Sequence, residues 1–192
     1  VRGVGGAECP VHYPQSGHAE QDPNEWWAAT VAAVRQATGW APSGSRIAGI
    51  GLAGQMHGTV LLGEEDKPIA PAIIWADGRS WRQAAQITDR VGAEKLVDIA
   101  GSPVATGFQA ATLLWLQQER SSIRWRARKV LTPKGGLRRR LTGEIATDPG
   151  DASGTLLLDV RWRTWSAELT KAVGIDQAKL PPLLASTEVA GT

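Results

Sequence analysis

The apolar residues of this chain fall into short runs, and the spacing within each run indicates its secondary structure. The first clear element begins after Asp22, a good helix-capping residue that is followed by a proline suited to the first helical turn. Trp27, Val31 and Val34 then recur at intervals of four and three residues, which is the spacing of one helical face. Gly39 is a typical helix stop. The sequence therefore predicts a helix between Asp22 and Gly39.

Further apolar runs predict a mixture of strands and helices. The run 46–52 is short and apolar, so we expect it to be a buried strand. The other predicted strands cover residues 59–62, 72–75, 129–131 and 156–158. The predicted helices cover residues 79–90, 93–99, 109–119 and 165–173, with a short helix after Lys134. This alternation predicts an α/β fold. Residues 1–19 begin glycine-rich and are expected to form a loose segment ahead of one domain over residues 20–192.

Composition narrows the class of protein. The 192 residues are enough for one globular domain with a core and marginal for two. The net charge of +2 does not indicate a bare nucleic acid as partner. The single Cys9 cannot form an internal disulfide, and neither a run of about 18 apolar residues nor a signal-peptide pattern is present. We therefore expect a cytoplasmic protein without a membrane partner.

The segment Gly54-Gln-Met-His-Gly58 follows the first predicted strand. Its two glycines allow a sharp turn that could hold Met56 and His57 over a cleft, and ligands of open α/β sheets collect at strand ends. The alternative is a plain turn with one hydrogen-bonded histidine. The three histidines have no metal-ligand spacing, which argues against a zinc site.

The segment 75–79 also ends an apolar run. The indole of Trp75 can lie against the C–H face of a sugar, while Asp77 and Arg79 can bond its hydroxyls. The alternative is a strand-end turn in which Asp77 caps the helix that starts near Ser80.

A third polar segment, residues 147–155, is predicted to be a glycine-bearing loop. A carboxylate such as Asp151 on this loop could accept a proton from a substrate hydroxyl, and positioned general bases contribute on the order of 10²–10⁴ in rate. The alternative is an Asx-turn without catalytic function.

Two basic clusters, 124–129 and 138–140, suggest nucleic-acid binding. Each is short, flanks an apolar segment and is balanced by acidic residues elsewhere, so a solvated face explains them better. No phosphate-binding loop of the Walker type and no Rossmann glycine triplet is present.

Taken in order, these segments resemble the xylulokinase branch of the FGGY family of carbohydrate kinases. The segments that carry the resemblance are Glu20–Pro23 with Trp26-Trp27, Gly49–Gly58, Pro71–Arg79, Lys129–Lys134, Leu141–Glu144 and Ala146–Thr155. The resemblance runs in register from about Glu20 to the end of the sequence.

The resemblance implies a fold of two actin-like, ribonuclease-H-like lobes around a cleft. Residues 20–192 would be part of the N-terminal sugar-binding lobe, without its first strands. ATP and Mg²⁺ would bind mainly to the other lobe, which is not in this sequence. The implied reaction transfers the γ-phosphoryl group of ATP to D-xylulose and gives D-xylulose 5-phosphate.

The resemblance also assigns roles to individual residues. Asp151 matches the catalytic base of the family, Met56 and His57 match its sugar-contacting pair, and Trp75 matches a tryptophan that lines the sugar site. We add Asp77 as a candidate sugar-binding residue. The sequence does not indicate which pentulose is preferred or what the oligomeric state is.

Some positions depart from the family pattern. Ala76 stands where asparagine is usual, Thr112 where lysine is usual, and Gly135-Gly136 where Asp-Tyr is usual, and no Asp-x-Gly-Thr motif precedes Glu20. We expect the chain to phosphorylate nothing by itself. A second hypothesis follows, in which the chain is a non-catalytic sugar-binding or structural remnant of such a kinase.

Overall fold

The computed structural model describes residues 2–192 and confirms the mixed α/β class within them. Its short strands pair antiparallel in twos: β1 (Glu20–Gln21) with β3 (Ala72–Ile73), β2 (Val60–Leu62) with β4 (Lys129–Leu131), and β5 (Leu158–Asp159) with β6 (Thr164–Trp165). A bridge between Thr59 and Ile73 connects the first two pairs. The strands β1 to β4 therefore form one continuous region at the centre of the molecule.

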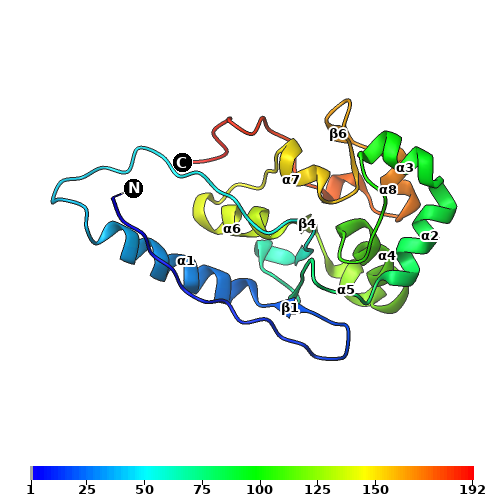
Figure 1. Ribbon diagram of the computed structural model, residues 1–192, viewed down its shortest axis with the longest axis horizontal. Helices are drawn as coiled ribbons and strands as arrows, with labels where there is room; N and C mark the ends of the chain where they lie inside the picture. The colour runs from blue at the N-terminus through cyan, green and yellow to red at the C-terminus, as the bar shows by residue number, and fades with distance from the viewer. Residues whose placement is uncertain (1) are drawn as a thin grey trace.

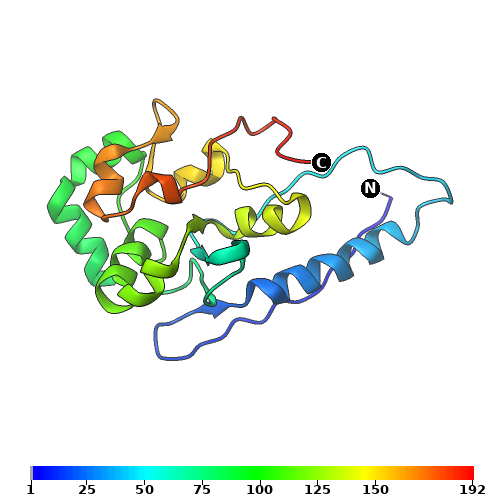
Figure 2. The same cartoon turned by 180° about the vertical axis from the view of Figure 1, so that it is seen from behind.

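The helices surround this region (Figures 1 and 2). They are α1 (Pro23–Thr38), α2 (Trp81–Val91), α3 (Ala93–Ala100), α4 (Gln109–Glu119), α5 (Ser121–Arg126), α6 (Pro133–Thr142), α7 (Pro149–Ser153) and α8 (Ala167–Ala172), with short 3₁₀ turns at Glu64–Asp66 and Gln177–Lys179. Helix α1 lies along one side, α2 to α5 and α8 gather at the far end, and α6 and α7 lie between them (Figure 1). All the helices predicted from the sequence are present within a few residues, whereas α5 and α7 were not predicted.

Helix α1 begins and ends where its sequence signals place it. The Asp22 carboxylate accepts a hydrogen bond from the N–H of Asn24 at 2.8 Å, and the N–H of Gly39 returns to the carbonyl of Arg35. The predicted apolar stripe is only half correct, because the buried residue is Trp26 and Val34 is 46% exposed.

The prediction of a buried strand at 46–52 is wrong. This segment is irregular and its large side chains face solvent, with Ile47 68% and Ile50 66% exposed. A strand needs hydrogen-bonding neighbours, and within residues 2–192 no backbone pairs with this one. An apolar pattern alone therefore did not determine its structure.

The main core is built around α4. Its sequence is apolar on nearly every face, as in a helix surrounded by protein, and Leu113 and Leu114 are almost completely buried. Ile87 of α2, Leu96 of α3 and Leu169 of α8 pack in the same cluster. None of the helices in the described part of the chain is long and apolar enough to cross a membrane.

The chain ahead of β1 first runs extended beside α1 and then turns back at residues 14–17 to enter β1 (Figure 2). His12 and Glu20 exchange backbone hydrogen bonds of 2.8 and 2.9 Å, and a Cβ at Gly5 would lie 1.9 Å from the carbonyl oxygen of Ala33. The segment therefore contacts the helix closely, and a domain boundary at residue 20 stays a prediction.

Candidate active site

The glycine-flanked turn packs directly against the first turn of α6. A Cβ at Gly54 would lie 2.9 Å from Cβ of Lys134, and one at Gly58 would lie 2.7 Å from Cγ of Pro133. Such contacts exclude any larger residue at either glycine. The two glycines therefore bring Met56 and His57 close to the helix that follows β4.

Gln109 at the start of α4 fixes the same turn from behind. Its buried side-chain amide donates to the carbonyls of Gly58 at 3.1 Å and Leu131 at 3.0 Å. A buried carbonyl needs such a partner. No sequence signal marks this glutamine, because both of its partners are backbone groups far away in the sequence.

His57 is held in a defined orientation. Its backbone has a φ of 69°, a conformation that non-glycine residues adopt rarely. Its Nδ1 lies 2.6 Å from the carbonyl oxygen of Gly154, and its ring packs on Phe108 with centroids 4.1 Å apart. Since a carbonyl only accepts, Nδ1 carries a proton, and the other ring nitrogen, Nε2, is left to contact a ligand.

The segment around Asp151 differs from its prediction as a loop. Residues Pro149–Ser153 form the short helix α7, and Asp148 caps it by accepting from the N–H groups of Gly150 and Asp151 at 3.1 and 3.3 Å. The Asx-type contact thus belongs to Asp148. This capping places Asp151 in the first turn of the helix.

Asp151 is nearly buried, with 7% of its surface exposed. Its Oδ2 accepts from the hydroxyl of Thr132 at 2.5 Å and lies 3.7 Å from Nζ of Lys134. Its Oδ1 takes part in no hydrogen bond within the described part of the chain. One carboxylate oxygen is therefore held by the protein while the other can meet a ligand.

Asp148 and Lys134 form the ion pair beside this carboxylate. Burial favours the neutral carboxyl and would raise the pKa of Asp148, but the hydrogen bond and charge of Lys134 outweigh it, with help from the N–H of Asp151 and the hydroxyl of Ser186. The pKa of Asp148 is therefore held below its ordinary value.

Trp75 is joined to the histidine through a second loop. Gly107 has a φ of 79°, and a Cβ there would lie 2.1 Å from the carbonyl oxygen of Trp75. The next residue, Phe108, packs on His57. Trp75 is 59% and Met56 is 53% exposed, so both side chains are open to a ligand.

Asp77 has a different environment and is 1% exposed. Its carboxylate accepts from the N–H of Ala19 at 2.6 Å and from the N–H and guanidinium of Arg79 at 2.9 Å. It does not cap α2, whose Ser80 N-cap makes no side-chain capping bond. Its oxygens are thus occupied by protein donors, and direct sugar contact by Asp77 stays a prediction.

The site therefore combines a held carboxylate, an oriented imidazole and an exposed indole. Within residues 2–192, no three histidine, cysteine or acidic side chains are grouped to hold a metal. The three arginines 138–140 contact groups of the chain itself, namely Asp148, Asp66 and the ring of Trp27.

Comparison with known proteins identifies the family. Residues 1–192 match the N-terminal domain of the FGGY family of carbohydrate kinases, and the chain belongs to this family. It is 40% identical over 187 residues to a xylulose kinase of Lactococcus lactis, covering 96% of this chain and 37% of that protein. A xylulose kinase of Klebsiella pneumoniae is also 40% identical, over 94% of this chain and 37% of its own length.

Solved structures agree with this assignment. A "xyloylose kinase" from Brucella ovis superposes with a TM-score of 0.89 at 41% identity, over 96% of this chain and 38% of that one. A ligand-bound xylulose kinase from Lactobacillus acidophilus gives a TM-score of 0.90 at 27% identity, over 97% and 38%. The fold predicted from the resemblance is thereby confirmed, and the chain spans little more than a third of the length of these relatives.

Proposed function

We propose that this chain is the sugar-binding part of a kinase that transfers the γ-phosphoryl group of ATP to D-xylulose. The product would be D-xylulose 5-phosphate. The observation that carries the proposal is the carboxylate of Asp151, with one oxygen held by Thr132 and the other free beside the turn that carries His57. Similarity to xylulose kinases along almost the whole chain supports D-xylulose as the sugar.

In this proposal Asp151 takes the proton of the attacking sugar hydroxyl through Oδ1. Thr132 and Lys134 act on the opposite oxygen and fix the direction of the carboxylate. Phosphoryl transfer depends mainly on an oriented nucleophile and on neutralised charge, so a positioned base of this kind is sufficient on the acceptor side.

The sugar itself would lie between the turn and the exposed indole. Trp75 would cover one C–H face of the sugar, and Nε2 of His57 would bond a hydroxyl while Met56 fills the adjacent space. Asp77 would hold Arg79 and the N–H of Ala19 in place, and its direct contact with the sugar stays a prediction. Each of these roles can be tested by substituting the residue concerned.

Kinases of this family use ATP and a divalent metal. The chain spans 37% of the length of its Lactococcus lactis relative, and the family resemblance supports binding of ATP and Mg²⁺ mainly by a second lobe. When bound, ATP with its metal supplies the γ-phosphoryl group that is transferred. A cytoplasmic location stays a prediction.

The test is a chimera in which this chain replaces the matching part of the Lactococcus lactis xylulose kinase. We expect it to phosphorylate D-xylulose, and we expect Asp151→Asn to lower turnover by about 10²–10⁴ with little change in sugar affinity. Asp159→Asn is the control for loss of a carboxylate elsewhere, because Asp159 accepts only from the backbone N–H groups of Arg161 and Trp162 and touches neither Thr132 nor Lys134. Full turnover in Asp151→Asn would contradict the assignment.

The departures at Ala76, Thr112 and Gly135-Gly136 favour the second hypothesis of a non-catalytic remnant. The glycines do not prevent α6 from forming, and Thr112 is buried in α4. A folded chimera that binds D-xylulose without turnover would support the remnant over the kinase.

A further inference from the structure

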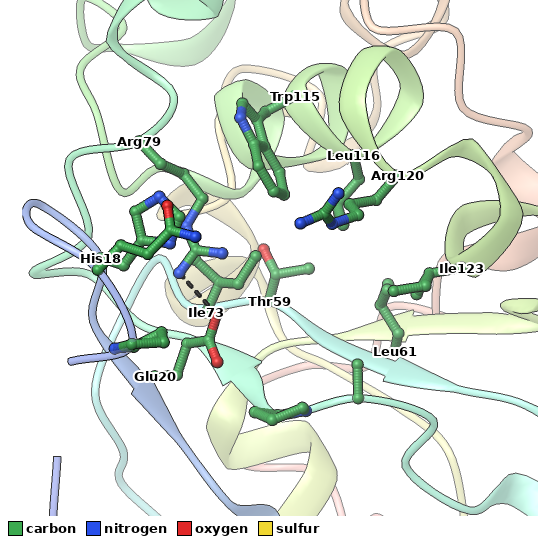
Figure 3. A pocket seen from close by; sticks show the side chains of 14 residues that line it. His18, Glu20, Thr59, Leu61, Ile73, Arg79, Trp115, Leu116, Arg120 and Ile123 are labelled. Atoms are coloured by element: carbon green, nitrogen blue, oxygen red, sulfur yellow. Dashed lines mark hydrogen bonds and ion pairs between the residues drawn. The ribbon is translucent and has the colours of Figure 1, made fainter. Parts of the chain in front are cut away.

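A cavity whose lining includes none of Met56, His57, Trp75 and Asp151 lies between β2, β3 and the end of α4 (Figure 3). Its volume is about 190 Å³. One part of its wall is apolar, formed by Leu61, Leu116 and Ile123, and the other part is polar. A cavity with both kinds of wall can orient a small amphiphilic molecule.

Thr59 supplies an unsatisfied polar group at this cavity. The residue is 2% exposed, and its side-chain oxygen has no hydrogen-bond partner within the described chain. A buried hydroxyl without a partner costs about 1–3 kcal/mol, so an acceptor that binds in the cavity within reach of this oxygen would recover that cost.

Two guanidinium groups reach the cavity from opposite sides (Figure 3). Arg79 is fixed and neutralised, because it pairs with Asp77 and Glu20 at 2.7 Å and lies 5.0 Å from the ring of Trp115. Arg120 is exposed and has no carboxylate within ion-pair distance among the described residues. Glu20 and Asp77 together balance the two guanidinium groups in number, but both carboxylates pair with Arg79, so among the described residues it is the charge of Arg120 that meets no carboxylate.

The opposite side offers an acceptor. Glu20 uses Oε1 to bind Arg79, and its Oε2 makes no hydrogen bond within residues 2–192. A ligand here needs an anionic group for Arg120 and a donor group for Glu20. Its carbon skeleton can lie against Trp115, whose indole faces the cavity.

We propose that this cavity binds a small hydroxycarboxylate. The carboxylate would accept from the guanidinium of Arg120 and the hydroxyl of Thr59, and the ligand's hydroxyl would donate to Glu20. The contacts follow from the charges and the unsatisfied oxygen, and they do not depend on the proposed kinase function.

The test is a titration of the ¹⁵N-labelled chain with lactate, monitored by NMR through the indole N–H signal of Trp115. That signal is assigned by its absence from the spectrum of Trp115→Phe. We expect saturation in the millimolar range, weaker binding of propanoate, which lacks the hydroxyl, and none of propane-1,2-diol, which lacks the carboxylate. Lactate that fails to saturate the signal, or a diol that binds as well, would overturn the proposal.

Two matched arginine variants test whether Arg120 supplies the positive charge that binds lactate. Arg120→Gln should weaken lactate binding about tenfold or more, since hydrogen bonds to charged groups are among the stronger ones. Arg126→Gln removes an exposed arginine that does not line this cavity and should leave binding unchanged. Equal weakening by both variants would indicate general charge attraction and contradict a specific site.

Thr59→Val adds a test in which the stability of the free chain and its affinity for lactate should change in different directions. Removing the unsatisfied hydroxyl should keep or raise the thermal stability of the free chain, while lactate affinity should fall several-fold. A variant that binds lactate as well as the unmodified chain would exclude Thr59 from the site.

Discussion

Asp148 combines three functions: it caps a helix, it carries a charge that pairs with Lys134, and it helps to position the candidate base Asp151. Its carboxylate caps α7, pairs with Lys134 and contacts Ser186, and its pKa is held below the ordinary value. A lowered pKa means that the folded state favours the charged carboxylate. Its contribution to stability is therefore present above the unfolded pKa of about 3.9 and is lost as the pH falls through the folded value.

Asp148→Asn tests this contribution, because asparagine is also a good capping residue and mainly the charge is lost. We expect the variant to be less stable near neutral pH by on the order of 1 kcal/mol. The difference from the unmodified chain should shrink as the pH falls below about 4. Urea unfolding at several pH values measures it.

Asp159→Asn is the control at this scale. Asp159 accepts from the N–H groups of Arg161 and Trp162 and pairs with no cation among the described residues. At neutral pH, Asp159→Asn should lower the free energy of unfolding by less than Asp148→Asn does. Equal losses would show that the cation beside Asp148 contributes nothing.

At the scale of elements, α6 connects the turn of His57 to Asp151, and its two glycines are its weakest feature. A Cβ at Gly136 would meet Val60 at 3.6 Å, an ordinary contact. Gly136→Ala should therefore stabilise the chain by up to about 1 kcal/mol through helix propensity. Thermal unfolding is the measurement, and a clear loss of stability would show that the helix needs the glycine.

Gly107→Ala is the contrasting substitution. Here the backbone is left-handed and a Cβ would lie 2.1 Å from the carbonyl oxygen of Trp75. We expect a loss of at least about 1–2 kcal/mol, together with a displaced Trp75 and weaker sugar binding. An unchanged chain would contradict the close contact between this loop and Trp75.

Local signals explain which elements could be predicted. Helix α1 begins after Asp22 and ends at Gly39, and both ends are set by contacts within a few residues. The sequence was therefore sufficient to predict this helix. The segment 46–52 failed because strand formation depends on distant partners. The residues Met56, His57 and Asp151 could be singled out by type and order, whereas the support of Asp151 by Thr132 could not, since nothing in the spacing links them.

At the scale of the whole molecule, the apolar segment 46–52 contributes little to the stability of this chain. Ile50→Ala removes a side chain that is 66% exposed and should change the free energy of unfolding by less than about 0.5 kcal/mol. Ile87→Ala is the matched substitution in the core, 1% exposed, and should cost about 2–5 kcal/mol. Equal costs in urea unfolding would mean that segment 46–52 is buried in solution.

In the proposed function, the residues around His57 and Asp151 form a sugar site. Calorimetric titration of the folded chain with D-xylulose, with D-ribulose and glycerol as controls, is the decisive test. We predict saturable binding that is selective for D-xylulose and is weakened by His57→Ala. A chain that is folded by circular dichroism and yet binds none of the three, or binds all alike, would contradict the claim.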